Sequence, residues 1–151
     1  MPSYLATWVF LFLGANSESK NKVISEVQNL VGTHSNLNSH EPMHQRLSTI
    51  PLSAWEDEMP IIDNVTRETM RLVKNGAALR RSVNDNFRVG DKTIRKGAFL
   101  AYHMADVHLN DKIYSEPLKF DPDRFSPPRN EDKQGNFVFL AWGAGRHVCA
   151  G

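Results

Sequence analysis

A single cysteine near the carboxyl end of the chain has surroundings typical of a reactive or ligand-binding thiol. Cys149 is the only cysteine, and residues 142–151 around it include three glycines together with Arg146 and His147. Glycine lets backbone N–H groups approach a ligand closely because it carries no side chain. The loop therefore suits a thiolate held against a flat, anionic ligand. The alternative is a buried, inert cysteine at the end of a tight turn.

Three other chemistries fit this loop less well. A dinucleotide-binding fingerprint needs a third glycine where Val148 stands, followed by a helix. A Cys/His hydrolase needs a base oriented by a third group, and nothing in the sequence marks one. A zinc site would have to take its remaining ligands from scattered histidines and acidic residues. Ligand binding through the Cys149 thiol remains the chemistry that the loop favours.

Two arginine motifs precede the loop. Glu68 and Arg71 lie three residues apart on a predicted helix, so their side chains share one face and can pair. They border the apolar stripe of that helix, and a buried carboxylate needs further donors, which predicts a second arginine from elsewhere in the chain. In residues 120–125, two aromatic side chains and a proline surround Arg124. Considered alone, that segment is interpreted as a loop held by its aromatic rings, with the arginine in water.

Together and in this order, the three motifs resemble the carboxy-terminal part of a cytochrome P450, a heme-thiolate monooxygenase. That family carries Glu-x-x-Arg on a helix, then Pro-x-Arg-Phe, then the heme loop Phe-x-x-Gly-x-Arg-x-Cys-x-Gly. In this chain the motifs read Glu68/Arg71, Pro122/Arg124/Phe125 and Trp142-x-x-Gly145-x-His147-x-Cys149-x-Gly151. Trp142 replaces the usual Phe and His147 the usual Arg, which keeps an aromatic wall beside the sulfur and a hydrogen-bond donor for a heme propionate.

The resemblance implies a role for each motif residue. Cys149 is expected to be the catalytic thiolate and the axial metal ligand of the heme iron, and its electron donation favours O–O cleavage. Glu68, Arg71 and Arg124 are expected to form a buried structural triad. The residues expected to bind the heme cofactor, an iron protoporphyrin, are those of the loop: Trp142, Gly143, Gly145, Arg146, His147, Cys149 and Gly151.

The implied function is that of an oxidoreductase that inserts one oxygen atom of O2 into a small apolar substrate, and the chain is similar to sterol-handling branches of the family. Its electrons would come from an NADPH-dependent reductase. The parent protein would lie on the cytosolic face of the endoplasmic reticulum membrane, through an amino-terminal anchor outside this chain. The alternative is a truncated, non-catalytic fragment that binds heme weakly or not at all.

The resemblance also implies the elements that must position these residues. The expected fold is mainly α-helical with small β hairpins (α+β), an incomplete P450 domain that runs from the end of the long central helix to the cysteine loop. Its expected parts within residues 1–151 are helices in 1–32, the Glu-x-x-Arg helix in 56–76, a β hairpin region in 80–102, the Pro-x-Arg-Phe motif and meander in 115–136, and the heme-thiolate loop in 137–151.

Apolar periodicity predicts the helices without reference to the family. Residues 4–15 are apolar on all sides, which predicts a helix buried by its neighbours. Residues 23–31 carry a helical stripe that stops at Gly32. A second stripe over residues 61–73 predicts a helix with the acidic residues Glu56 to Glu58 at its beginning, Pro60 in its first turn and Gly76 at its end.

The remaining segments predict loops and strands. Residues 33–50 are polar and lack periodicity, which predicts a loop. Residues 88–94 alternate around a Gly-Asp pair, which predicts two short strands joined by a tight turn. Residues 98–102 and 137–142 are apolar runs, and the second is expected to be strand-like before it enters the glycine-rich loop.

Composition excludes several classes of protein. Lys plus Arg number 18 and Asp plus Glu 17, so the chain lacks the basic excess of an extended nucleic-acid surface. One cysteine excludes a small domain held together by disulfides. The apolar stretch 4–15 has 12 residues, whereas a transmembrane helix needs about 20. No basic residue precedes that stretch, which disfavours a signal peptide.

Overall fold

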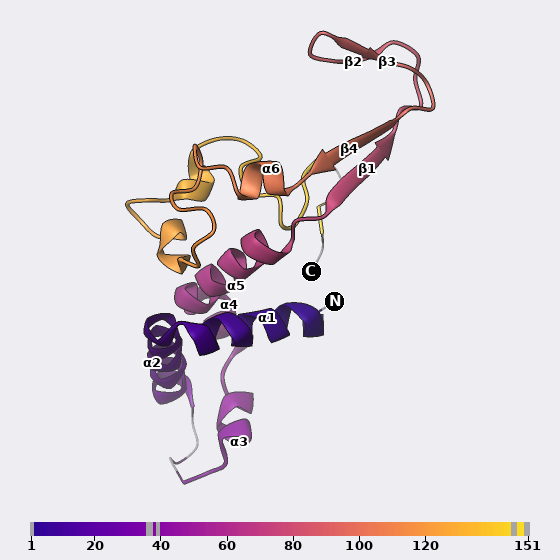
Figure 1. The fold of residues 1–151 in the computed structure, drawn as a ribbon. Coiled ribbons are helices and arrows are strands. Elements are labelled where there is room, and N and C mark those ends of the chain that lie inside the picture. The colour runs from indigo at the N-terminus through magenta and orange to yellow at the C-terminus, as the bar shows by residue number, and fades with distance from the viewer. Residues whose placement is uncertain (1, 36–37, 39, 146–147, 150–151) are drawn as a thin grey trace. The chain divides into compact units, whose positions relative to one another are not determined.

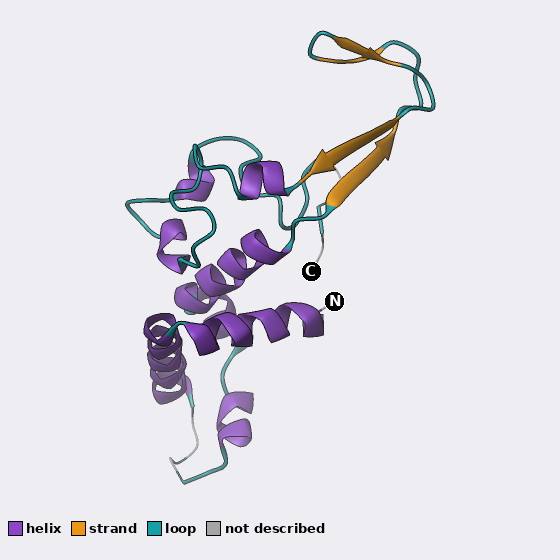
Figure 2. Cartoon of the chain, viewed as in Figure 1, coloured by secondary structure: helices purple, strands orange, loops and turns teal. Residues whose placement is uncertain are grey.

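The chain divides into two compact units. One consists mainly of helices, and the other contains the short antiparallel strands seen in Figure 1. The structure is a computed structural model and describes residues 2–35, 38, 40–145 and 148–149. Unit 1 comprises Met1–Met70 and Lys119–Glu131, and unit 2 comprises Arg71–Leu118 and Asp132–Gly151. The predicted class, mainly α with small hairpins, is confirmed, as Figure 2 makes visible.

Unit 1 is helical. Its helices are α1 (Pro2–Ala15), α2 (Ser17–His34), α3 (Met43–Ser48), α4 (Leu52–Asp57) and the larger part of α5 (Pro60–Val73). Within the unit, the second segment contributes the 3-10 turn η1 (Pro122–Phe125) and the first residue of η2 (Glu131–Lys133). The prediction of a loop throughout residues 33–50 was wrong at two places. Helix α2 does not stop at Gly32 but continues to His34, and the short helix α3 begins directly after Pro42.

Two apolar clusters hold the helices of unit 1 together. One joins the end of α2 to α4 and the approach to α5 through Leu30, Val31, Ile50, Ala54 and Met59. The other joins α1, α2 and α5 through Leu13, Val23 and Val65. The ring of Phe12 also stacks on that of Phe120, with centroids 4.6 Å apart, and so connects α1 to the second segment of the unit.

Helix α1 is less buried than its sequence predicted. Leu13 is buried, but Phe10 is 73% and Leu11 57% exposed. Within the described residues of unit 1, packing partners reach α1 from one side, through the Leu13 cluster and the Phe120 ring. The expectation of a helix covered on all sides is therefore wrong for this chain.

The start of α5 agrees with the prediction for Pro60, which is the first residue of the helix, but not for the acidic residues. The acidic residues expected at its beginning fall in α4 and the turn after it, because the residue before a proline avoids the helical conformation and Pro60 therefore separates the helices. The carboxylate of Glu26, on α2, instead accepts hydrogen bonds from the N–H groups of Ile61 (2.7 Å) and Ile62 (2.9 Å). A negative charge at this end also interacts favourably with the helix dipole.

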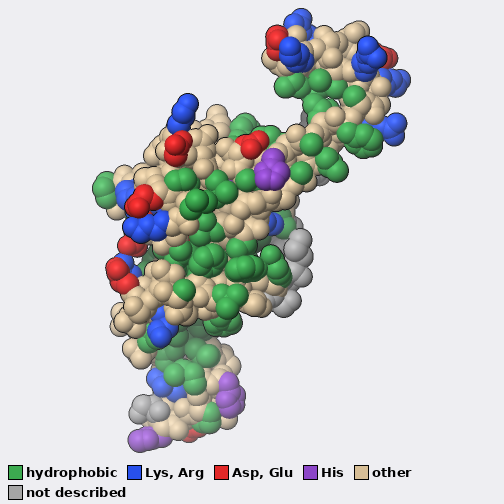
Figure 3. Space-filling view, viewed as in Figure 1, with side chains coloured by type: hydrophobic (Ala, Val, Ile, Leu, Met, Phe, Trp, Pro, Cys, Tyr) green, Lys and Arg blue, Asp and Glu red, His purple; other side chains and the backbone are tan. Residues whose placement is uncertain are grey.

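Unit 2 contains the strands. Strand β1 (Ala77–Arg81) pairs antiparallel with β4 (Phe99–His103), and β2 (Phe87–Val89) pairs with β3 (Lys92–Ile94). Gly90, at φ 58°, forms the tight turn that the sequence predicted between β2 and β3. On the face shown in Figure 3, basic side chains project from this hairpin together with acidic ones. Strand β4 is followed closely by the short helix α6 (Ala105–His108).

The end of α5 also lies in unit 2. The helix ends at Val73 rather than at Gly76, and the side chain of Asn75 donates to the Leu72 carbonyl at 2.6 Å, which satisfies one of the free carbonyls at the helix end. No helix in the described part of the chain has both the length and the apolar character needed to cross a membrane.

We expect Glu26→Gln to lower the free energy of unfolding by about 1 kcal/mol, because the amide loses the charge and one acceptor oxygen at the start of α5. The urea midpoint of the helical circular dichroism signal measures this change. Glu56→Gln, at an exposed carboxylate of α4, is the matched control and should shift stability by less than about 0.5 kcal/mol. Equal effects of the two substitutions would contradict the capping role.

Candidate functional site

The cysteine loop is closed by a hydrogen bond at its base. The Cys149 N–H donates to the Trp142 carbonyl at 2.8 Å, and the Cys149 thiol is free and exposed. Gly143 and Gly145 have φ values of 81° and 84°, which side-chain-bearing residues rarely adopt. A Cβ atom at Gly145 would meet none of the described residues within 4 Å, so the described part of the chain leaves space there.

These features fit a flat ligand bound through the thiol. The accessible sulfur, the space beside Gly145 and the half-exposed side chain of Trp142 all belong to unit 2. Of the predicted site residues, Trp142, Gly143, Gly145 and Cys149 are thus found in one closed loop. The other predicted loop residues, Arg146, His147 and Gly151, lie outside the described residues. Among the described residues, no three His, Cys, Asp or Glu side chains gather as a metal-binding group.

The segment before the loop is held by side chains rather than by a strand partner. The Tyr114 hydroxyl donates to the Val138 carbonyl at 2.8 Å, and Lys74 Nζ donates to the Ala141 carbonyl at 2.6 Å. Between them, the Leu140 N–H donates to His108 Nε2 at 3.0 Å. The expectation of a strand-like run over residues 137–142 is therefore wrong, because these side chains take the backbone positions that a neighbouring strand would occupy.

His108 is a buried and neutral histidine. Burial, together with the nearby Arg71 and Lys74 charges, lowers its pKa from 6.5 to about 4, and a hydrogen bond to the Lys74 backbone partly opposes this shift. Because Nε2 accepts a hydrogen from an amide, the neutral ring must carry its own hydrogen on Nδ1. Nδ1 is buried and makes no hydrogen bond of good geometry with the described residues.

Arg71 is fully buried and binds backbone in unit 2. Its Nη1 donates to the carbonyls of His108 (2.5 Å) and Pro117 (2.7 Å), and its guanidinium lies 5.0 Å from the centre of the Tyr114 ring. Arg71 therefore connects the end of α6 to the beginning of the meander. In the sequence, Tyr114 lies between these two contact points.

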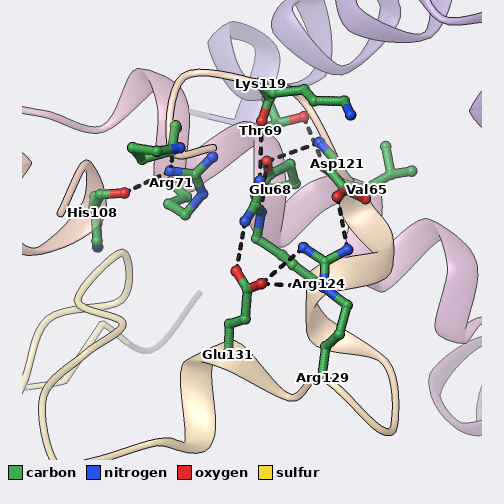
Figure 4. Close-up of polar contacts among 11 residues, drawn as sticks. Val65, Glu68, Thr69, Arg71, His108, Lys119, Asp121, Arg124, Arg129 and Glu131 are labelled. Carbon is green, nitrogen blue, oxygen red and sulfur yellow. Dashed lines mark hydrogen bonds and ion pairs between the residues drawn. The ribbon is translucent and has the colours of Figure 1, made fainter. Parts of the chain in front are cut away.

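Glu68 and Arg124 form a fully buried ion pair in unit 1, with Arg124 Nε 3.1 Å from Glu68 Oε1 (Figure 4). Arg124 Nη1 also donates to Glu131 at 2.6 Å. The interpretation of Arg124 as a solvated side chain, reached from its segment alone, is wrong: its exposure is 0%. The sequence argument that a buried Glu68 would need a further arginine agrees with this pair.

Two further residues close the ion pair into a ring. Arg129 binds Glu131 at 2.8 Å and Asp121 at 2.7 Å. The Asp121 N–H, in turn, donates to Glu68 Oε1 at 3.0 Å. Sequence reasoning missed Asp121, Arg129 and Glu131. Their opposite charges near the Pro-x-Arg-Phe motif were the available signal, but charges so close in sequence are usually solvated.

We expect Glu68→Gln to destabilise the chain by about 3 kcal/mol, because removing one partner of a buried ion pair leaves the other charge without compensation. Chemical denaturation monitored by circular dichroism measures the change. Asp123→Asn is the matched control: it removes a carboxylate of the same meander that pairs with Lys22 at the surface, and should cost about 1 kcal/mol or less. The role of the ring would be disproved by a Glu68→Gln effect no larger than that of the control.

We expect stability to fall as the pH is lowered from 6.5 towards 4, because His108 takes up a proton in the unfolded chain at a higher pH than in the folded one. The pKa difference corresponds to a contribution of about 3 kcal/mol to the free energy of unfolding. This contribution is fully present above pH 6.5 and is lost as the pH falls through 4. The urea midpoint measured at several pH values, wild type minus His108→Gln, isolates this contribution. A difference in urea midpoint between wild type and His108→Gln that is the same at pH 7 and pH 5 would contradict this prediction.

Comparison with known proteins identifies the family. The sequence model of the family described as Cytochrome P450 matches residues 3–151. The chain is 30% identical over 151 residues to the cytochrome P450 monooxygenase AacuE of Aspergillus aculeatus, a match that covers 98% of this chain and 30% of that protein. It is also 30% identical to the sterol 14-demethylase of Arabidopsis thaliana, over 99% of this chain and 29% of the relative.

Solved structures agree with the sequence matches. The structure described as retinoic acid bound cyanobacterial CYP120A1 superimposes with a TM-score of 0.71 at 27% identity, over 95% of this chain and 30% of that one. The chain therefore spans about 30% of the length of the proteins that it matches. The motif resemblance is confirmed: the chain belongs to the cytochrome P450 family of heme-thiolate monooxygenases.

Proposed function

We propose that this chain forms the thiolate-bearing part of a heme-dependent monooxygenase, with Cys149 as the axial ligand of the heme iron. The observation that carries the proposal is the free, exposed thiol of Cys149 at the base of a glycine-lined loop. Bound heme would supply the activation of O2, in which one oxygen atom enters a C–H bond of the substrate and the other leaves as water, with two electrons and two protons taken up. A thiolate ligand favours the O–O cleavage that this chemistry requires.

The other loop residues have distinct parts in this proposal. Gly143, Gly145 and Gly151 would allow backbone N–H groups to approach the sulfur and adjust its electron donation. Trp142 would form an aromatic wall beside the sulfur. Arg146 and His147 would donate to the heme propionates, for which two cationic side chains at the loop are chemically suited.

The buried ion pairs have a structural part. Glu68, Arg71 and Arg124 would act as a triad that maintains the position of the meander before the loop. Support comes from the Glu68–Arg124 pair in unit 1 and, separately, from the binding of Arg71 to the Pro117 carbonyl in unit 2. None of the three would contact the substrate.

The substrate class is proposed from the relatives. Two relatives are sterol demethylases by name, and the solved structure cited above is bound to retinoic acid. Sterols and retinoic acid are both largely apolar, so we infer a small apolar, sterol-like substrate for the parent protein. The proposed electron donor is an NADPH-dependent reductase, and the proposed location is the cytosolic face of the endoplasmic reticulum membrane.

The competing proposal is a chain that does not catalyse and holds heme weakly. What favours it is the coverage: the chain corresponds to about 30% of its relatives. Heme titration followed by reduction with dithionite and addition of CO separates the two proposals. A strongly red-shifted Soret band, the signature of a thiolate ligand, supports the heme-thiolate site, whereas free-heme behaviour supports the competing proposal.

We expect Cys149→Ser to abolish the red-shifted band, because serine supplies no thiolate to the iron. The absorption spectrum of the reduced, CO-treated chain is the measurement. His44→Ala is the control: it removes an exposed imidazole that could bind iron adventitiously, and should leave the band unchanged. Persistence of the band in Cys149→Ser would rule out the proposed ligand.

A further inference from the structure

The backbone before the cysteine loop is bound at closely spaced points by side chains from three different places in the sequence. Tyr114 binds the Val138 carbonyl, His108 binds the Leu140 N–H, and Lys74 binds the Ala141 carbonyl. We call these three side chains, Lys74, His108 and Tyr114, the backbone clamp. All of them, and the segment that they bind, lie in unit 2.

We propose that the backbone clamp positions the Cys149 loop for iron ligation, a role that rests on the proposed function. The last clamped residue is Ala141, and the next residue, Trp142, supplies the carbonyl that receives the Cys149 N–H at 2.8 Å. A displacement of the clamped segment would therefore pass to the base of the loop through one peptide unit. Ligand geometry at a metal tolerates errors of only about 0.5 Å, so the anchoring of this segment matters.

The clamp is needed because the segment has no hydrogen-bonding ladder. No described residue of the segment 137–142 belongs to a strand, and three of its partly buried backbone groups are instead paired by these side chains. The contacts also alternate in kind: two side chains donate to carbonyls and one accepts from an N–H. Both kinds of backbone group in the segment, the carbonyl and the N–H, are therefore paired by side chains.

His108 is suited to its place in the clamp. Acceptance from the Leu140 amide requires a neutral ring with the hydrogen on Nδ1. The ring is fully buried and lies 5.7 Å from the Phe139 ring, centroid to centroid. Arg71 binds the His108 carbonyl, which restrains the backbone that carries the ring.

Lys74 adds a contact with the loop itself. Its Nζ lies 5.5 Å from the centre of the Trp142 ring, within the range of a cation–π interaction. Lys74 thus contacts both the last clamped carbonyl and the first side chain of the loop. Through these contacts it orients the ring that is proposed to stand beside the sulfur.

The first experiment uses the 151-residue chain without heme and measures amide hydrogen exchange at Leu140 and Cys149 by NMR. We expect His108→Ala to speed exchange of both amides by about tenfold, the effect of losing one ordinary hydrogen bond. Tyr114→Phe, which removes only the hydroxyl, and Lys74→Met should both speed exchange at Cys149. His108→Gln and Lys74→Arg, which restore an acceptor and a donor, should recover most of the protection.

The matched controls are Tyr102→Phe and Lys112→Met, which make the same chemical changes at a strand tyrosine and a surface lysine outside the clamp. They should leave the exchange of both amides unchanged. Faster exchange at Leu140 with unchanged exchange at Cys149 would overturn the proposal, because the contacts would then be local and would not position the loop.

The second experiment adds heme, dithionite and CO and measures the fraction of the red-shifted thiolate band. Each clamp deletion should reduce that fraction at least about threefold, whereas His108→Gln, Lys74→Arg and the controls should retain it. A wild-type chain without the band would refute the proposed function, and the exchange results alone would then decide whether the clamp positions the loop. A wild-type band that all clamp deletions preserve would overturn the clamp while leaving the proposed function intact.

Discussion

Backbone N–H and C=O groups that are shielded from water must form hydrogen bonds, and helices and strands normally provide the partners. The part of this chain that leads to the cysteine has little such regular structure. Between α6 and the end of the described chain, the described residues form two short 3-10 turns and otherwise coil. Side chains therefore supply the partners. In unit 2 they bind the carbonyls of His108, Pro117, Val138 and Ala141 and the N–H of Leu140, and in unit 1 the carbonyl of Lys119 and the N–H of Asp121.

This constraint explains why charged residues are buried in so small a chain. An arginine carries several donors in a rigid fork and can bind two carbonyls or two carboxylates at once, as Arg71 and Arg124 do here. Desolvation of such charges is costly, and it is tolerated only where every partner is present. In unit 1 the ring through Glu68, Arg124 and Glu131 meets that condition, since each charge faces an opposite one.

The same constraint connects fold to function. Among its described residues, the Cys149 loop has one backbone hydrogen bond across its base, so its placement depends on the segment that precedes it. Through the backbone clamp, that segment is held by the residue directly after α5, by α6 and by the chain beyond α6. In a heme-thiolate enzyme the protein contributes ligand position and sulfur environment, while the cofactor contributes the oxygen chemistry. The anchoring of an irregular segment is thus part of the proposed catalytic function.

The sequence by itself determined the family, the cysteine loop and the helical stripes of α2 and α5, because motif spacing and periodicity are local properties of the chain. Only the tertiary structure decided that Arg124 is buried, that α1 is exposed on one side, and that His108 receives the Leu140 amide. The partners in the backbone clamp lie 24 to 67 residues apart. No periodicity spans such separations, and the path of the chain alone brings these groups within hydrogen-bonding distance.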